Sequence, residues 1–300
     1  MKRFSPTLVM ALLVSLTPAH ATLQVFACEP EWAALTQELA GDQATVYTAT
    51  HALQDPHHIQ AKPSLMAAAR RADLLVCTGA ELEAGWLPLV LRQSGNVAIQ
   101  RGKPGHFEAA NHVRKLEVPT QLDRADGDVH ASGNPHIQTD PRNIAAVAQA
   151  LAKRLGEVDP AHINTYQAKL NDFNSRWDRA MQRWTVAATP LRGLPIVVQH
   201  QGFPYLVQWL KLKQVASLEP KPGVEPSSAH LSTVLTELLQ HPAKAVIRAA
   251  YSEGRSSQWL ADRARIPVVV LPFTVGGSEQ AKDLFGLFDN TMAQLLNIVK

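Results

Sequence analysis

The sequence lacks most of the features that mark a specialised class of protein. Its 300 residues include only two cysteines, which excludes a disulfide scaffold, and no heptad array, repeat or low-complexity tract typical of fibrous or disordered chains. After residue 21, no run of about 18 apolar residues is long enough to span a bilayer. With 46% hydrophobic and 18% charged residues, the chain is typical of a globular protein with one large core or two smaller ones.

A strong charge of either sign is also missing. The 29 basic side chains include Lys2 and Arg3 at the N-terminus, and the other 27 face 26 acidic side chains. This balance argues against nucleic acid as a partner. Histidine, in contrast, is abundant with 12 residues, and its arrangement along the chain is the main clue to function.

The first 21 residues predict a secretory signal peptide that precedes the mature chain. Residues 1–3 are cationic, residues 8–16 are apolar, and residues 19–21 read Ala-His-Ala, a typical cleavage site. A membrane anchor is the alternative, but the apolar run is short and Pro18 interrupts its end. Residues 25–28 faintly resemble a lipoprotein cleavage box, although Cys28 lies well past the apolar run. We therefore expect a free periplasmic protein.

The two cysteines can pair in such an oxidising compartment. Cys28 and Cys77 each follow a short apolar run, so they could sit side by side at one edge of a parallel sheet. The alternative is that both are small buried hydrophobic residues.

Short apolar runs alternate with helical patterns in both halves of the chain. This alternation predicts an α/β fold of two lobes, each with a parallel sheet flanked by helices. The expected strands are 23–27, 44–48, 74–78, 97–99, 196–198, 215–218, 245–247 and 268–271. The expected helices are 32–39, 64–71, 86–91, 203–210, 228–239, 257–264 and 279–298.

One long helix is expected to join a lobe of residues 22–159 to a lobe of residues 189–300. Apolar side chains recur every three or four residues from Ile163 to Trp184, and Asp159 and Pro160 are typical of a helix start. A helix over residues 160–188 would be roughly 40 Å long. So rigid a connection limits hinge motion, and we expect a ligand site between the lobes to be largely preformed.

Residues 100–133 are polar and rich in glycine and proline, which predicts a long loop. Its acidic and imidazole side chains could gather loosely bound cations, or the segment could simply be a solvated loop. These side chains are His106, His112, His130, Asp123, Asp126 and Asp128.

Three other histidines share a local setting. His57, His136 and His200 each lie just beyond an expected strand or at the start of a helix. In open parallel sheets, ligands bind outside the carboxyl ends of the strands, so loops from both lobes would face a shared cleft. Taken singly, histidines in such a setting are more often structural residues than ligands.

The sequence around these histidines resembles the metal-binding family of ABC-transporter substrate-binding proteins, the zinc and manganese uptake receptors of bacteria. The resemblance runs from about residue 23 to the C-terminus and depends on several blocks in the family's order. The blocks are Asp55-Pro56-His57 with Pro63-Ser64 and Ala72 to Val76, Asn134-Pro135-His136 with Asp140 to Asn143, His200 with Phe203, Tyr205 and Leu212, and Glu219-Pro220.

The resemblance implies two α/β lobes joined by a long helix, with His57, His136 and His200 as metal ligands. His58 would then support or compete with these ligands. The fourth position departs from the family, which often places a carboxylate after one of the last two core strands. Residues 270–273 read Val-Leu-Pro-Phe and residues 248–250 read Arg-Ala-Ala. Glu253 is the nearest acidic candidate, and a water molecule is the other.

The ligand types favour Zn(II) as the bound ion. Three imidazoles with few carboxylates suit zinc, whereas Mn(II) prefers oxygen-rich octahedral sites, and Cu(II) remains open because it also binds nitrogen. The resemblance implies that the protein captures the ion and hands it to an ABC permease, with a periplasmic metallochaperone as a further candidate partner. We expect a monomer.

Two other functions compete with this interpretation. The same cleft could bind another metal or a metal chelate. Three histidines and a water also describe a hydrolytic zinc centre, but the sequence contains no His-Glu helix motif, nucleophile elbow or P-loop, so we expect no enzyme. No feature indicates a surface interaction protein.

Overall fold

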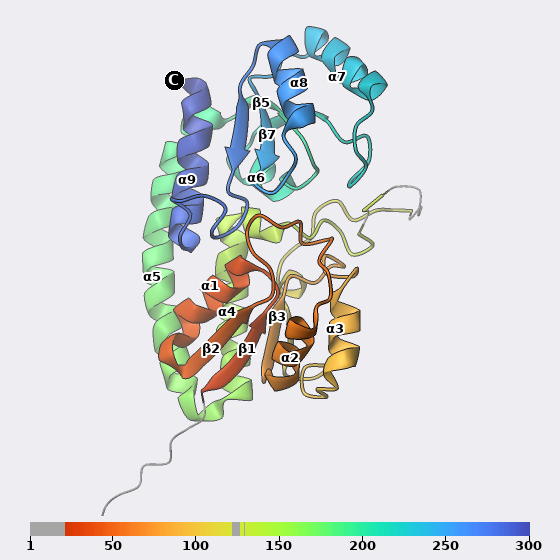
Figure 1. Ribbon diagram of the computed structural model, residues 1–300. Coiled ribbons are helices and arrows are strands. Elements are labelled where there is room, and N and C mark those ends of the chain that lie inside the picture. The colour runs from red at the N-terminus through yellow and green to blue at the C-terminus, as the bar shows by residue number, and fades with distance from the viewer. Residues whose placement is uncertain (1–21, 122–126, 129) are drawn as a thin grey trace, which may run out of the picture.

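Two parallel four-stranded sheets, one in each half of the chain, form the framework of the computed structural model (Figure 1). The structure describes residues 22–121, 127–128 and 130–300, so the expected signal peptide lies outside the described residues. The N-terminal sheet has the order β2-β1-β3-β4 and the C-terminal sheet the order β6-β5-β7-β8. The strands are β1 (Leu23–Ala27), β2 (Ala44–Thr48), β3 (Leu74–Cys77), β4 (His106–Glu108), β5 (Pro195–Val198), β6 (Lys213–Ser217), β7 (Ala245–Ala249) and β8 (Val268–Leu271).

Helices pack on both faces of each sheet, which confirms the predicted α/β class with two lobes (Figure 1). They are α1 (Pro30–Ala40), α2 (Pro63–Arg71), α3 (Leu87–Ser94), α4 (Pro141–Val158), α5 (Ile163–Ala187), α6 (Pro204–Leu210), α7 (Ser228–Gln240), α8 (Arg255–Ala264) and α9 (Leu284–Leu296). Among the described helices, none is both long and apolar enough to cross a membrane.

The long helix α5 runs alongside both lobes, with α9 packed beside it (Figure 1). Its apolar stripe is buried because it faces α1 and α4 of the first lobe and α9 at the end of the chain. Trp177 Nε1 donates to the carbonyl of Pro141, and Trp184 Nε1 donates to Asp289 Oδ1 on α9 at 2.6 Å. The C-terminal helix is therefore bound to the connecting helix rather than to its own lobe alone.

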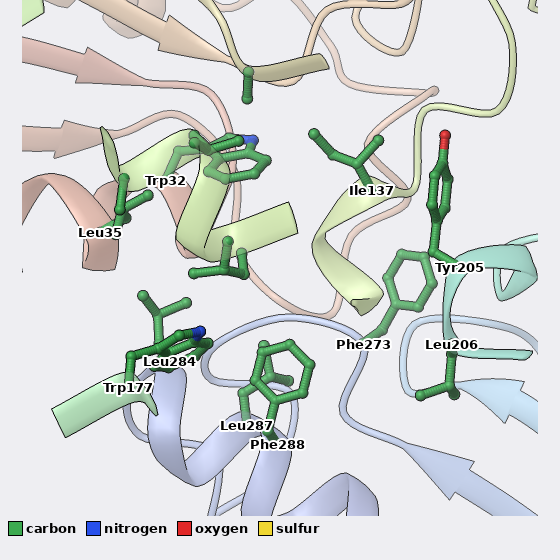
Figure 2. Close-up of a cluster of buried hydrophobic side chains, with 14 of the residues drawn as sticks. Trp32, Leu35, Ile137, Trp177, Tyr205, Leu206, Phe273, Leu284, Leu287 and Phe288 are labelled. Carbon is green, nitrogen blue, oxygen red and sulfur yellow. The ribbon is translucent and has the colours of Figure 1, made fainter. Parts of the chain in front are cut away.

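A single apolar core continues from one lobe into the other. Figure 2 shows Ile137 of the first lobe beside Tyr205 and Phe273 of the second, with the α5 and α9 side chains Trp177 and Phe288 nearby. Such a shared core opposes independent motion of the lobes, because separating them would expose apolar surface to water.

Two sequence predictions were wrong. Residues 97–99 form a turn, not a strand, because the Asn96 side chain donates to the carbonyls of Ala69 and Ala72 and bends the chain there. The fourth strand is instead β4, inside the expected loop, where Phe107 is buried against the core. Helix α4 was not expected, although Asp140 caps its first turn and its apolar residues recur at helical spacing.

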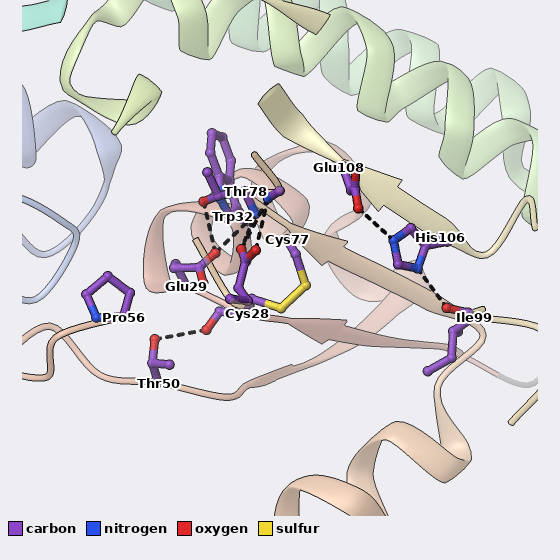
Figure 3. Close-up of a disulfide and its surroundings, with 12 residues drawn as sticks. Cys28, Glu29, Trp32, Thr50, Pro56, Cys77, Thr78, Ile99, His106 and Glu108 are labelled. Carbon is purple, nitrogen blue, oxygen red and sulfur yellow. Dashed lines mark hydrogen bonds and ion pairs between the residues drawn. A yellow bond between two sulfur atoms is a disulfide. The ribbon is translucent and has the colours of Figure 1, made fainter. Parts of the chain in front are cut away.

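A disulfide joins Cys28 and Cys77, as the sequence suggested (Figure 3). The strands that precede them, β1 and β3, are neighbours in register, with Ala27 opposite Val76. The two cysteines therefore leave the sheet side by side, with Cα atoms 4.8 Å apart. The bond holds together the carboxyl ends of β1 and β3, the two inner strands, on the side of the sheet that faces the second lobe (Figure 1).

Candidate metal centre

His57 lies in the loop that follows β2, and its ring is oriented by a carboxylate. Its Nδ1 is 2.7 Å from Asp55 Oδ1, and the same oxygen accepts the backbone N–H of His57. Trp86 Nε1 donates to the carbonyl of Pro56 and anchors the loop on the first lobe. Because the Asp55 carboxylate can only accept, Nδ1 carries the proton and the lone pair of Nε2 is free to bind a ligand.

His136 opens the turn before α4 and is almost fully buried, with 1% of its surface exposed. The side chain of Asn134 accepts the backbone N–H of His136 and shapes the turn, while Phe273 of the other lobe packs edge-on against the ring. Among the described residues, its Nδ1 has no hydrogen-bond partner. The nitrogen that faces the other histidines is Nε2, which lies 3.3 Å from His200 Nε2, so this ring is oriented by packing and not by a carboxylate.

His200 follows β5 in the second lobe and has the same support as His57. Its Nδ1 lies 2.7 Å from Glu219 Oε2, which also accepts the backbone N–H of Gly223 at 2.7 Å. This contact again places the proton on Nδ1 and leaves the Nε2 lone pair free. Burial lowers the pKa of His200, but the hydrogen bond and charge of Glu219 outweigh it, and the pKa is raised overall.

The three rings meet between the lobes. One nitrogen from each of His57, His136 and His200 lies within 4.8 Å of the other two, and the Nε2 atoms of His136 and His200 are 3.3 Å apart. The space in front of them is a pocket of about 170 Å³. It is lined by Glu117, Asp128, His130, Asn134, His136, His200, Gln201 and Pro222.

Burial keeps two of the imidazoles at this site, His136 and His130, uncharged. It lowers the pKa of His136 well below its usual range, and the neighbouring His57 and His200 lower it further. Burial and the proximity of His57 lower the pKa of His130 to about 4. Neutral imidazole is the form that binds metal ions, so these histidines can coordinate without first losing a proton.

The other two candidate residues, His58 and Glu253, have mostly exposed side chains. The side chain of His58 is 65% exposed and its Nε2 lies 3.6 Å from Asp128 Oδ2. The side chain of Glu253 is 71% exposed, and its carboxylate is 3.7 Å from Arg255. His58 thus contacts a residue that lines the pocket, whereas Glu253 lies beside an arginine at the surface.

The loop histidines separate into two groups. His106 forms hydrogen bonds with the carbonyl of Ile99 and the carboxylate of Glu108 (Figure 3). His112 stacks on Phe107, so both histidines have partners within the first lobe. His130, in contrast, reaches the pocket, where its Nε2 is 3.3 Å from His57 Nε2. Of the loop aspartates, Asp128 lines the pocket, whereas Asp123 and Asp126 lie outside the described residues.

No sequence pattern distinguishes His130 from the other loop histidines. It lies 73 residues from His57, and only the folded chain brings the two rings together. Asp55 and Glu219 were part of the recognised blocks, but their role in orienting His57 and His200 was not anticipated.

A second cluster of buried acidic groups lies beside the disulfide (Figure 3). Glu83 accepts the backbone N–H groups of Thr78 and Gly79, while Glu29 accepts the hydroxyl of Thr78. Burial raises the pKa of Glu83 to about 7, and burial together with Glu83 raises the pKa of Glu29 well above its usual range. Because both sulfurs are in the disulfide, this cluster has no thiolate to offer a metal.

Glu31 belongs to the same acidic region and connects the lobes. The hydroxyl of Thr274, in the segment after β8, donates to Glu31 Oε2 at 2.5 Å. Burial raises the pKa of Glu31 to about 7 from 4.5. Because the folded state binds this proton more tightly than the unfolded state does, the shift adds to the free energy of unfolding. The contribution is fully present below about pH 4.5 and is lost as the pH rises through about 7.

The variant Glu31→Gln should therefore be less sensitive to pH than the wild type. Between pH 5 and pH 8 it should lose less unfolding free energy than the wild type, by on the order of 2 kcal/mol, since glutamine does not titrate. Urea unfolding at both pH values with a chelator present measures this difference. Glu237→Gln, at an exposed position of α7, should behave as the wild type does. Equal pH dependence of Glu31→Gln and the wild type would contradict the prediction.

Comparison with known proteins places this arrangement in a family. The sequence model of the family described as "ZnuA: Zinc-uptake complex component A periplasmic" matches residues 25–298. The chain belongs to this family. The resemblance inferred from the histidine blocks is thus confirmed at the level of the family, and the match covers both lobes and the connecting helix.

Characterised relatives are distant in sequence and differ in the metal in their names. The chain is 23% identical to the high-affinity zinc uptake system protein ZnuA of Yersinia pestis over 212 residues, which cover 64% of each chain. It is 24% identical to the zinc-binding lipoprotein AdcA of Streptococcus pneumoniae over 76% of this chain and 44% of AdcA. It is 21% identical to the manganese ABC transporter substrate-binding lipoprotein PsaA of Streptococcus pneumoniae over 89% of this chain and 85% of PsaA.

Solved structures share the fold over nearly the whole chain. A crystal structure of ZnuA superposes with a TM-score of 0.76 at 21% identity, covering 93% of this chain and 98% of that chain. The Cd-bound periplasmic metal-binding protein from Candidatus Liberibacter asiaticus superposes with a TM-score of 0.76 at 16% identity, covering 93% and 100% of the two chains. Both comparisons support the two-lobed architecture.

Proposed function

We propose that the protein is the extracytoplasmic metal-binding component of an ABC transporter and that its cargo is Zn(II). His57, His136 and His200 bind the ion between the lobes, and the loaded protein delivers it to a membrane permease. The observation that carries the proposal is the convergence of three histidine nitrogens within 4.8 Å of one another, beside a pocket that both lobes line.

The surroundings of the three rings support a role in binding metal. Histidine ligands of metals usually donate their second nitrogen to a carboxylate or carbonyl, which fixes the ring and raises its basicity. Asp55 and Glu219 occupy this place for His57 and His200. A histidine with a purely structural role can also pair with a carboxylate. A structural role does not explain why the second nitrogens of two such histidines converge on one point.

The pocket favours an ion over a larger metal chelate. Its volume of about 170 Å³ is below the roughly 300 Å³ at which pockets for organic ligands begin. The carboxylate of Glu117 lines the pocket, but it accepts hydrogen bonds from Asn134 and Gln201. The carboxylate of Asp128 lines the pocket as well, but the imidazoles of His57, His130, His136 and His200 outnumber these two carboxylates, a donor set that suits Zn(II) better than Mn(II).

The names of the relatives support a role in metal transport, and they include both zinc and manganese. ZnuA and AdcA are named for zinc and PsaA for manganese, and the name of PsaA also places it in an ABC transporter. The disulfide is typical of an oxidising compartment, which supports a periplasmic location.

Titration of the purified, demetallated protein tests the cargo. We expect one Zn(II) per chain, with an affinity at least 100-fold higher than that for Mn(II), because three nitrogen donors suit zinc. Competition with a chromophoric chelator gives both affinities, and elemental analysis of the protein as purified gives the metal bound in the cell. Tighter binding of Mn(II), or of Cu(II) with copper present in the purified protein, would overturn the assignment to zinc. Failure to bind any divalent metal would overturn the function itself.

A further inference from the structure

His130 contacts the three-histidine cluster through a second short nitrogen–nitrogen distance. Its Nε2 is 3.3 Å from His57 Nε2, just as His136 Nε2 is 3.3 Å from His200 Nε2. Because His57 Nδ1 donates to Asp55, His57 Nε2 is a bare lone pair that faces the His130 ring. Two imidazole nitrogens at this distance share either a proton or a cation between them.

Both nitrogen–nitrogen distances match the edge length of a tetrahedral zinc site. With zinc–nitrogen bonds of about 2.0–2.1 Å, the nitrogens of a tetrahedral site lie about 3.3–3.4 Å apart. The pairs His57–His130 and His136–His200 have no residue in common, so they correspond to opposite edges of such a tetrahedron. The group of nitrogens that all lie within 4.8 Å of one another contains His57, His136 and His200 but not His130, so His130 joins the group through His57 and must approach the other two rings when an ion closes the site.

The backbone around His130 is held on both sides of the cleft. The N–H of Asp128 donates to the carbonyl of Pro222 in the second lobe at 2.8 Å, and a side chain on Gly127 would collide with that carbonyl. On the other side, the backbone N–H and hydroxyl of Ser132 donate to the Glu81 carboxylate of the first lobe at 3.1 and 2.7 Å. Asp128 and Ser132, two residues before and after His130, thus contact the second and the first lobe respectively.

We propose that His130 is the fourth protein ligand of the metal ion, so that four imidazoles close the site. This inference rests on the proposed function and replaces the two candidates named from the sequence. Glu253 points to solvent beside Arg255, and a bound water is unnecessary where a fourth nitrogen is already in contact.

A closed site of four histidines has two consequences. It strengthens the preference for borderline metals such as Zn(II) over Mn(II), because four nitrogens fill the coordination sphere and leave the pocket carboxylates of Glu117 and Asp128 outside it. It also leaves no open position for an activated water, which hydrolytic zinc centres require. Both consequences suit a carrier rather than an enzyme.

The experiment compares His130→Ala with His58→Ala and Glu253→Gln in the full mature chain, by chelator competition with Zn(II) and Mn(II). We expect His130→Ala to lower the Zn(II) affinity about 10- to 100-fold and to change the Mn(II) affinity by less than about 3-fold. The other two variants should bind as the wild type does. Circular dichroism and the melting temperature of the demetallated variants establish that each one folds.

X-ray absorption at the zinc edge gives a readout that a merely structural role would not change. The number of imidazole ligands that fits the spectrum should be four for the wild type and three for His130→Ala. Three rings in the wild type, or unchanged affinity in His130→Ala, would overturn the role of His130 and indicate a water as the fourth ligand. If the wild type binds zinc and loses it in the His57, His136 and His200 variants, the proposed function stands whatever His130 does. If the wild type binds no zinc, both proposals fail.

Discussion

Replacing His57, His136 or His200 by alanine should lower the Zn(II) affinity by at least about 100-fold for each substitution, and the triple variant should bind no zinc at micromolar concentrations. Losing a partner that merely orients a metal ligand typically costs 10- to 100-fold, and losing the ligand itself removes a metal–nitrogen bond as well. Calorimetry and chelator competition measure the loss.

The three single variants should differ in stability, which separates their effects on binding and folding. His57→Ala and His200→Ala leave the Asp55 and Glu219 carboxylates without their histidine partners, whereas His136→Ala leaves a cavity at a position that is 1% exposed. Melting curves with a chelator present detect these changes without the metal. His241→Ala, at an exposed position after α7, is the matched control and should bind zinc normally. Unchanged zinc binding by the triple variant would refute the site.

Removing the disulfide should lower the free energy of unfolding by about 4 kcal/mol. Cys28 and Cys77 are 49 residues apart, and the entropy that such a crosslink removes from the unfolded chain corresponds to about this value. We propose the double variant Cys28→Ala and Cys77→Ala, because both positions are fully buried and alanine brings no polar group into the core. Urea unfolding of the chelator-treated protein gives the difference in free energy.

Reduction of the wild type provides an independent check of this value. Wild-type protein unfolded in the presence of a thiol reductant should be as unstable as the double alanine variant, since both lack the crosslink. If the double variant unfolds within about 1 kcal/mol of the oxidised wild type, the bond contributes little. The stability would then depend mainly on the apolar core that the two lobes share.

Most of the fold could be predicted from the sequence because the relevant signals are local. The run from Leu23 to Ala27 and the run from Val268 to Leu271 form strands with the predicted bounds, since short apolar runs between turns have few other structures available. Helix α5 likewise follows from one apolar stripe with a capped start. The strand assigned to residues 97–99 failed because Asn96 makes side-chain hydrogen bonds with distant carbonyls, and no local pattern reveals them.

The candidate site, too, could be predicted only in part from local sequence. By itself, the sequence determined that His57, His136 and His200 stand beyond strands or at the starts of helices, where ligands bind in parallel α/β folds, and the family match spans all three positions. Only the tertiary structure decided that His130 joins them while His106 and His112 do not, and that Asp55 and Glu219 orient two of the rings. The reason is physical: residue type and spacing set the local backbone, whereas packing of the lobes decides which of several chemically equivalent histidines meet.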